Sequence, residues 1–240
     1  MNTILRRLLI GAGAVLLVGI VVLGAGWLYF VNYSPDRARY PVRGIDVSHH
    51  QGAIDWPLVA ADDVSFVIIK ATEGGDYVDE RFAENLRDAR AAGLTVGAYH
   101  YFTLCRPGAE QAANFLATVP RDQDLLPPVV DLEYEGNCDA DRSPEAVRAE
   151  LDAFLAPVEA AFGQQAVFYI TYGFFDDYAK YLPRRPLWTR WIAWHPADEN
   201  WLLWQYHNAG RVNGIDGDVD LNVLQGGRET LTSLVRLSPA

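Results

Sequence analysis

The sequence predicts an α/β fold, a closed barrel of eight strands and about five helices, preceded by one N-terminal transmembrane helix. Three observations support this prediction. Apolar strand patterns alternate with amphipathic helix patterns from residue 43 to about residue 181, and three further strand patterns without helices then follow. Before them, residues 8–31 carry no charged side chain. Because alternating strands and helices are typical of parallel sheets with right-handed crossovers, we expect the strands to be parallel.

The uncharged stretch 8–31 is long enough to span a membrane. As a helix it would extend roughly 36 Å, and the core of a bilayer is about 30 Å thick. Trp27 and Tyr29 lie near its C-terminal end, where aromatic side chains favour the membrane interface. We therefore expect a single-pass transmembrane anchor at 8–31 and a short polar linker at 32–43.

Arg6 and Arg7 precede the anchor and predict its orientation. They favour a cytoplasmic N-terminus at 1–7, with the rest of the chain on the periplasmic or other extracytoplasmic side of the inner (cytoplasmic) membrane. A cleaved signal peptide is the alternative, because residues 24–26 are small. The apolar residues 27–31 directly after them favour an uncleaved anchor.

The remaining chain is long enough for one domain with a sizeable core. Its partners are limited by charge, because a formal net charge of −11 disfavours binding to nucleic acid. The cysteines and histidines do not have the spacing of a metal site, and we expect neither a metal nor a cofactor.

The predicted elements follow from hydrophobic periodicity and from turn residues. Nearly continuous apolar runs predict buried parallel strands. The expected strands are 43–48, 64–70, 94–102, 127–133, 166–172, 187–195, 201–207 and 218–224. The expected helices begin near 53–57 and cover 79–92, 107–119, 143–162 and 174–181. In such barrels the functional site lies at the C-terminal ends of the strands.

Two acids end the fourth strand, Asp131 and Glu133. Alternate residues of a strand share a face, so both carboxyl groups are expected to enter one cavity while Leu132 packs the other way and Val129 forms the floor. Their proximity and partial burial should separate their pKa values, leaving one acid protonated beside an anion. Cleavage of a glycosidic bond needs this arrangement. The alternative is a surface strand end with two solvated acids.

Further acids and aromatic residues fall at the same predicted rim. Asp46, Glu73 and Asp220 lie near the ends of the first, second and last strands, and a closed barrel makes the first and last strands neighbours. Aromatic rings suit the apolar faces of sugars. The predicted sugar-binding aromatics are Tyr99, Tyr101, Tyr172, Trp194 and Trp204, with core packing as the alternative for each.

The two cysteines, Cys105 and Cys138, each follow a predicted strand. If those strand ends share one rim, the thiols can meet as a disulfide that closes a loop of about 32 residues and contributes on the order of 3–4 kcal/mol. That pairing requires an oxidising compartment, consistent with an exported domain. Two unrelated buried thiols are the alternative.

Six segments, in the same order along the chain, resemble motifs of the glycoside hydrolase family 25 lysozymes, the Chalaropsis-type N-acetylmuramidases. The opening motif is Gly44-Ile45-Asp46-Val47-Ser48 and continues to residue 56. The other segments are 66–74, 93–102, 131–133, 204–206 and 219–222. Together they identify residues 44–240 as a catalytic domain of this family.

The resemblance implies a modified TIM-like barrel, (β/α)5(β)3, that hydrolyses the β-1,4 bond between N-acetylmuramic acid and N-acetylglucosamine in peptidoglycan. It implies that Glu133 is the general acid/base, that Asp131 assists it, and that Asp46 and Asp220 line the same site. We expect a monomer whose substrate is the peptidoglycan glycan strand. The alternatives are a peptidoglycan-binding module without turnover and a chitinase-like hydrolase, although the run of acids that precedes the chitinase glutamate is replaced by Val129 and Val130.

Overall fold

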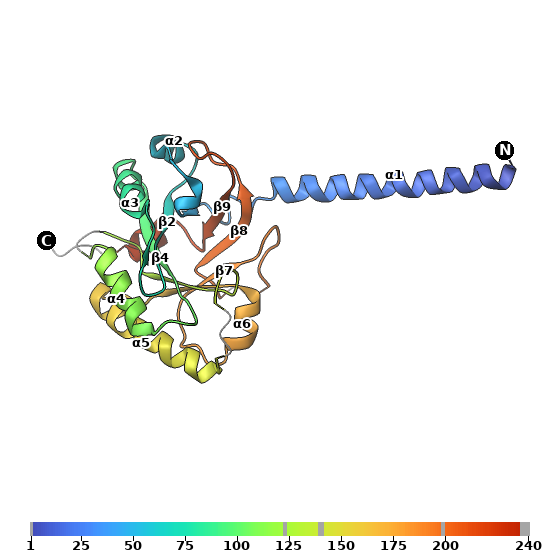
Figure 1. The fold of residues 1–240 in the computed structure, drawn as a ribbon. Helices are drawn as coiled ribbons and strands as arrows, with labels where there is room; N and C mark the ends of the chain where they lie inside the picture. Colours follow the sequence, from blue (N-terminus) through green and yellow to red (C-terminus); the bar gives the residue numbers. More distant parts are fainter. Residues whose placement is uncertain (1, 122–123, 139–141, 198–199, 236–240) are drawn as a thin grey trace. The chain divides into compact units, whose positions relative to one another are not determined.

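The computed structural model describes residues 2–121, 124–138, 142–197 and 200–235. The chain divides into two compact units, Met1–Ser34 and Pro35–Ala240. The first unit is the helix α1, Thr3–Asn32 (Figure 1). Its segment Leu9–Asn32, with a mean hydropathy of 2.5, is long and apolar enough to cross a membrane. The predicted span 8–31 lies within this helix.

The second unit is built on a closed barrel of eight strands among the described residues. Pairing runs from each strand to the next around the sheet, and the pairing of β1 with β2 closes it. A short strand β3, Tyr77–Val78, only extends β2 as a hairpin. The barrel strands are β1 Arg43–Val47, β2 Phe66–Glu73, β4 Thr95–Tyr101, β5 Val129–Leu132, β6 Val167–Ile170, β7 Leu187–Arg190, β8 Leu203–Gly210 and β9 Val219–Leu224. The predicted barrel is confirmed.

The last strand differs from the expected parallel sheet. Apart from the β2–β3 hairpin, neighbouring strands from β1 to β8 are parallel, but β9 is antiparallel to both β8 and β1. The connection 211–218 between β8 and β9 is too short for a crossover, so the chain must turn back on itself. The reversal has a functional consequence, because it brings the beginning of β9 to the rim where the other strands end.

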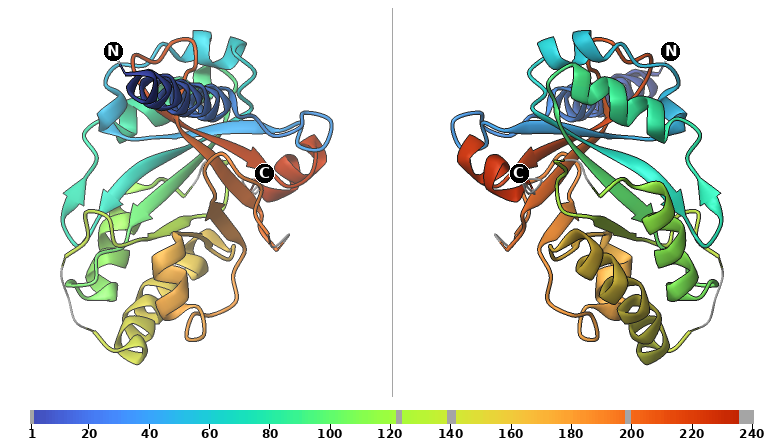
Figure 2. Two further views of the ribbon diagram at one scale, coloured as in Figure 1. Left: turned by 90° about the vertical axis from the view of Figure 1, so that its right-hand side faces the viewer. Right: turned by 90° about the vertical axis from the view of Figure 1, so that its left-hand side faces the viewer.

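Helices cover the outside of the barrel wall (Figures 1 and 2). Their apolar sides pack against outward-facing strand residues such as Ile45, Val130 and Leu132. The helices are α2 Trp56–Ala61, α3 Phe82–Ala91, α4 Gly108–Thr118, α5 Pro144–Phe162 and α6 Tyr172–Tyr178, with a 3₁₀ turn at His49–Gln51. The predicted helix 143–162 is α5, which begins with Ser143 as its cap and Pro144 in its first turn.

A second apolar cluster fills the barrel interior. It is formed by residues of the opposite strand face, including Ile68, Val129 and Tyr169. The helix α7, Arg228–Leu234, was not predicted; its Leu231 packs against this cluster near the end opposite the functional rim, beside Phe66 at the start of β2.

The expected linker 32–43 is shorter than predicted, because its second half belongs to the folded domain. Tyr40 is 3% exposed, and its ring packs 5.5 Å from that of Trp201 and 5.9 Å from that of Trp204, measured between centroids. Its hydroxyl lies 2.8 Å from Nε2 of His195. These residues cover part of the outer face of β8, where the barrel has no helix.

Candidate active site

The rim of the barrel holds a cavity of about 450 Å³. The predicted acids Asp46, Glu73, Asp131, Glu133 and Asp220 all line it. The other lining residues are Ser48, His50, Lys70, Tyr99, Tyr101, Glu135, Gly136, Tyr169, Trp188, Arg190 and Gln205. The parallel strands deliver their C-terminal ends to this cavity, and the reversed β9 delivers its N-terminal end.

Asp131 and Glu133 enter the cavity from the end of β5. Leu132 between them packs into the outer core, and Val129 packs inside the barrel below Asp131. This alternation follows from the two-residue period of an extended chain. Among the described residues, the buried Oδ1 of Asp131 has no hydrogen-bond partner. An acceptor left unpaired in this way is costly unless a ligand supplies a donor.

Burial sets the ionisation of this acid pair. It raises the pKa of Glu133 to about 7, while the nearby Arg190 cation opposes the rise. Burial also raises the pKa of Asp131 well above its usual range, and the charge of Glu133 raises it further. Burial is therefore the largest cause of the raised pKa at Glu133, whereas the expected repulsion between the two acids raises the pKa of Asp131. A carboxyl group with a pKa near 7 can donate a proton at neutral pH.

A second acid pair lies across the barrel seam. Asp46 of β1 is in register with Asp220 of β9, and their side chains hydrogen-bond to each other. Burial and then the charge of Asp220 raise the pKa of Asp46 well above its usual range. Burial raises the pKa of Asp220 to about 6, against the effect of Arg190. Two carboxyl groups in contact favour the state that shares one proton.

A chain of side-chain hydrogen bonds fixes the orientation of Asp46. The hydroxyl of Tyr169 donates to Oε1 of Gln205 at 2.9 Å, and Gln205 Nε2 donates to Oδ2 of Asp46 at 3.2 Å. From the other side, the indole of Trp188 donates to Oδ1 of Asn222 at 2.8 Å, and Asn222 Nδ2 donates to the same Asp46 oxygen at 2.6 Å. Because each amide oxygen already accepts a bond, each amide nitrogen must face Asp46.

Two cations border the acids. Lys70 is buried, donates to Oε2 of Glu73 at 2.7 Å, and lies 5.1 Å from the ring centroid of Tyr101. Arg190 at the end of β7 lies 3.6 Å from Oε2 of Glu135. Both cations lower the pKa of Asp131 and of Glu133, so the cavity balances burial, which favours protonation, against nearby positive charge.

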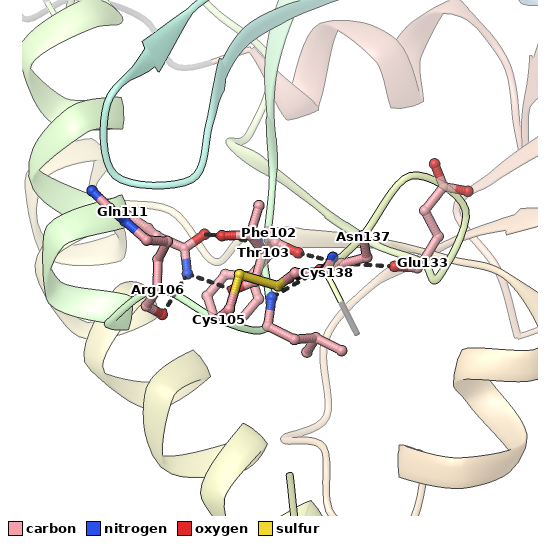
Figure 3. The surroundings of a disulfide bond; sticks show 9 residues. Phe102, Thr103, Cys105, Arg106, Gln111, Glu133, Asn137 and Cys138 are labelled. Atoms are coloured by element: carbon pink, nitrogen blue, oxygen red, sulfur yellow. Dashed lines mark hydrogen bonds between the residues drawn. A yellow bond between two sulfur atoms is a disulfide. The ribbon is translucent and has the colours of Figure 1, made fainter. Parts of the chain in front are cut away.

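The loop after Glu133 is held by a disulfide and by an asparagine (Figure 3). Cys105 and Cys138 form the predicted disulfide, with their Cα atoms 6.1 Å apart. Asn137 Nδ2 donates to the carbonyl of Glu133 at 2.9 Å and to that of Phe102 at 3.0 Å. In Figure 3 the carboxyl group of Glu133 points away from these contacts. The backbone of Glu133 is therefore fixed while its side chain remains available to the cavity.

The predicted sugar-binding aromatics divide into two groups. Tyr99 and Tyr101 of β4 line the cavity, whereas Tyr172, Trp194 and Trp204 do not. Trp204 is 0% exposed, so its predicted contact with a sugar is wrong; it faces outward from β8 and packs against Tyr40.

Tyr172 and Trp194 lie beyond their strands, because β6 ends at Ile170 and β7 ends at Arg190. The two residues are 65% and 67% exposed, respectively.

Several residues that face the cavity were not predicted from the sequence. Gln205 lies next to Trp204 and points to the opposite side of β8, and Trp188 and Arg190 occupy alternate positions of β7. The two-residue alternation of the strands would have identified them once the correct face was known. Among the described residues, no group of three or more His, Cys, Asp or Glu side chains is arranged to hold a metal ion.

Comparisons with known proteins agree with this fold. The sequence model of the glycosyl hydrolases family 25 matches residues 45–215. The uncharacterized protein YegX of Escherichia coli O157:H7 is 35% identical over 225 residues, 87% of this chain and 81% of that protein. Lysozyme M1 of Streptomyces globisporus is 35% identical over 211 residues, 80% of this chain and 71% of that protein.

Among solved structures, a family 25 glycosyl hydrolase from Bacillus anthracis superimposes with a TM-score of 0.77. It is 33% identical in sequence, and the match covers 84% of this chain and 97% of that one. The residues matched by the family model, 45–215, contain most of the barrel.

Proposed function

The chain belongs to the glycosyl hydrolases family 25, and from this premise we propose that it is a lysozyme, a 1,4-β-N-acetylmuramidase. It hydrolyses the β-1,4 bond between N-acetylmuramic acid and N-acetylglucosamine in peptidoglycan, with retention of configuration. The observation that carries the proposal is the acid pair Asp131 and Glu133, which lines one cavity with Glu133 at a pKa of about 7.

Glu133 is the general acid in the first step. Its protonated carboxyl group donates a proton to the glycosidic oxygen as the bond from that oxygen to C1 of the muramyl sugar breaks. A pKa of about 7 keeps a substantial fraction of Glu133 protonated at neutral pH. In the second step the resulting carboxylate accepts a proton from the attacking water.

Asp131 assists by orienting the substrate's own acetamido group. Its buried Oδ1, which has no hydrogen-bond partner among the described residues, can accept a bond from the acetamido N–H. The acetamido oxygen then attacks C1 as the leaving group departs, and water later opens this intermediate from the opposite face. Two inversions at C1 give net retention. Attack by an enzyme carboxylate is the alternative route and gives the same stereochemistry.

Asp46 and Asp220 support the same site. Sharing one proton, they present one negative charge to the region where positive charge develops on the sugar. Tyr99 and Tyr101 bind the sugar rings from the wall formed by β4.

The test is digestion of purified sacculi and of chitin by the wild-type chain and by Glu133→Gln. We expect new reducing ends on N-acetylmuramic acid from sacculi only. The variant should lose at least about a thousandfold in kcat, because general acid and base roles are both removed, while its circular dichroism spectrum shows that the fold is retained. Binding to sacculi without turnover would favour a binding module. Turnover of chitin would favour a chitinase-like hydrolase. Full activity of Glu133→Gln would exclude the assigned role.

The N-terminal helix anchors the enzyme as part of this proposal. An uncleaved α1 with residues 1–7 in the cytoplasm holds a monomeric catalytic domain on the extracytoplasmic side, where its substrate lies. The full chain should remain in the membrane fraction after washing at high pH, and protease added outside should digest the domain. Recovery of a shorter, soluble chain would support a cleaved signal peptide instead.

A further inference from the structure

A second hollow of about 210 Å³ lies beside the catalytic cavity. We call it the aromatic annex; its principal residues are Tyr172, Phe175, Leu187, Arg190, Trp191 and Trp201. The rings of Tyr172 and Trp191 meet edge to face, with centroids 6.2 Å apart. Unlike the acid-lined cavity, the annex offers mostly apolar surface, which suits aliphatic groups better than sugar hydroxyls.

Arg190 connects the two hollows, because it lines both of them. Its side chain is 28% exposed, and within the described part of the chain it makes no hydrogen bond. Its ion pair with Glu135 is long, at 3.6 Å, and the Glu135 side chain is 81% exposed. A guanidinium has five donors in a planar fork that matches a carboxylate, so Arg190 can bind an anionic group at the junction.

We propose that the aromatic annex binds the stem peptide of the muramyl residue that is cleaved. This inference rests on the proposed lysozyme function. In peptidoglycan the muramyl sugar carries a lactyl group, and the attached peptide combines small aliphatic side chains with a free carboxylate. The annex packs against the aliphatic part, and Arg190 binds the carboxylate. Asp176, which also lines the annex, can accept from a peptide N–H.

The arrangement makes the enzyme selective for peptide-bearing strands. A chitin chain has no lactyl group and no peptide, so it can fill the acid-lined cavity but leaves Arg190 without its ligand. A charge-assisted hydrogen bond at a partly buried site is consistent with about a tenfold difference in affinity or more. Arg190 is thus assigned as a specificity-determining residue.

Binding is measured first, with the full chain in detergent micelles and tryptophan fluorescence as the signal. The probes are muramyl dipeptide, N-acetylmuramic acid and N-acetylglucosamine. Muramyl dipeptide should bind about tenfold more tightly than either sugar alone. Arg190→Gln and Tyr172→Ala should remove this advantage, and Tyr172 is exposed enough that the second variant keeps the fold. Glu135→Gln should strengthen binding, because it releases Arg190 from its ion pair.

Arg87→Gln is the matched control, because Arg87 pairs with Asp88 on the outer helix α3, and it should bind all three probes as wild type does. Equal affinity for the three probes would overturn the proposal. Equal affinity for muramyl dipeptide and N-acetylmuramic acid would also overturn it, because Arg190 would then bind only the lactyl carboxylate. An unchanged preference in both annex variants would exclude the annex.

Turnover provides the second arm and separates this inference from the proposed function. Intact sacculi are compared with sacculi whose stem peptides have been removed by an amidase. We expect kcat/KM to be about tenfold higher on intact sacculi, and we expect this difference to lie in KM. The difference should be smaller in Tyr172→Ala. No turnover of either substrate, with the binding preference retained, would contradict the lysozyme function alone. Equal turnover of both would contradict the annex alone.

Discussion

Asp46 and Asp220 face each other across the one antiparallel seam beside β1, in direct register and in hydrogen-bond contact. The reversal of β9 produces this contact, because it brings the second residue of the last strand to the rim where the first strand ends. A parallel last strand would have placed Asp220 near the opposite end of the barrel. The negative charge that Asp220 brings to the active site therefore depends on the direction of β9, although the general acid Glu133 follows a different strand, β5.

Asn222→Leu tests the hydrogen bonds that orient this pair. The variant removes a donor to Asp46 and leaves the buried indole N–H of Trp188 without its acceptor. An unpaired buried polar group costs about 1–3 kcal/mol, so the free energy of unfolding should fall by that amount. The pKa of Asp46 should rise further, because the lost hydrogen bond lowers it. Urea unfolding and the pH profile of kcat measure both effects; an unchanged pH profile would contradict the orienting role.

Glu133→Gln should change how stability depends on pH. Burial raises the pKa of Glu133 from an ordinary value of 4.5 to about 7. The folded state therefore binds its proton more tightly than the unfolded state does. The stability that this contributes is complete below pH 4.5 and is lost as the pH rises through 7. The difference corresponds to about 3 kcal/mol at most.

Glutamine does not ionise, so Glu133→Gln does not lose this stability as the pH rises. The free energy of unfolding of the variant minus that of wild type should therefore be larger at pH 8 than at pH 5. Urea unfolding at the two pH values measures this difference. Glu84→Gln, on the exposed side of α3, is the control and should shift equally at both. If Glu133→Gln also shifts equally at both values, the carboxyl group is not buried as described.

The acid pair was predictable from the sequence, whereas much of the surrounding site was not. Asp131 and Glu133 share a face because the two-residue period is a property of the extended backbone. The aromatic predictions depended on strand ends and strand faces, which the local sequence pattern does not give. Trp194 lies outside a strand that stops four residues earlier, and Trp204 lies on the outer face while its neighbour Gln205 faces the cavity.

Contacts between residues far apart in the sequence could also not be predicted from local sequence patterns. Nothing in the immediate sequence of Arg190 indicates that its guanidinium will border both acid pairs and the annex, since those contacts come from distant strands. The direction of β9 was accessible in principle, because the segment 211–218 is short for a crossover. The packing of Tyr40 against Trp201 and Trp204 was hidden by its position in a polar segment.

The Cys105–Cys138 disulfide should support both stability and turnover. Replacing both cysteines with alanine releases a cross-link between residues 33 positions apart, which is expected to cost about 3–4 kcal/mol. Because Asn137 next to Cys138 holds the carbonyl of Glu133, kcat should also fall. Activity with and without reductant measures the effect, and the double variant should not respond to reductant. Full activity of a wild-type chain whose thiols titrate as reduced would contradict this prediction.

Tyr40 should be part of the folded domain although it precedes the barrel. Its ring is buried between Trp201 and Trp204, and its hydroxyl contacts His195. Tyr40→Ala should therefore lower the free energy of unfolding by about 3–5 kcal/mol, whereas Tyr40→Phe, the matched control, should lose only about 0.5–1.5 kcal/mol with the hydrogen bond. A chain that starts at residue 35 should keep the stability of the domain, and one that starts at residue 44 should lose more than Tyr40→Ala does, because Val42 is also buried. Urea unfolding of the four chains measures this order. A change of less than about 0.5 kcal/mol in Tyr40→Ala, the range of ordinary surface substitutions, would show that residues 35–43 are a linker as the sequence suggested.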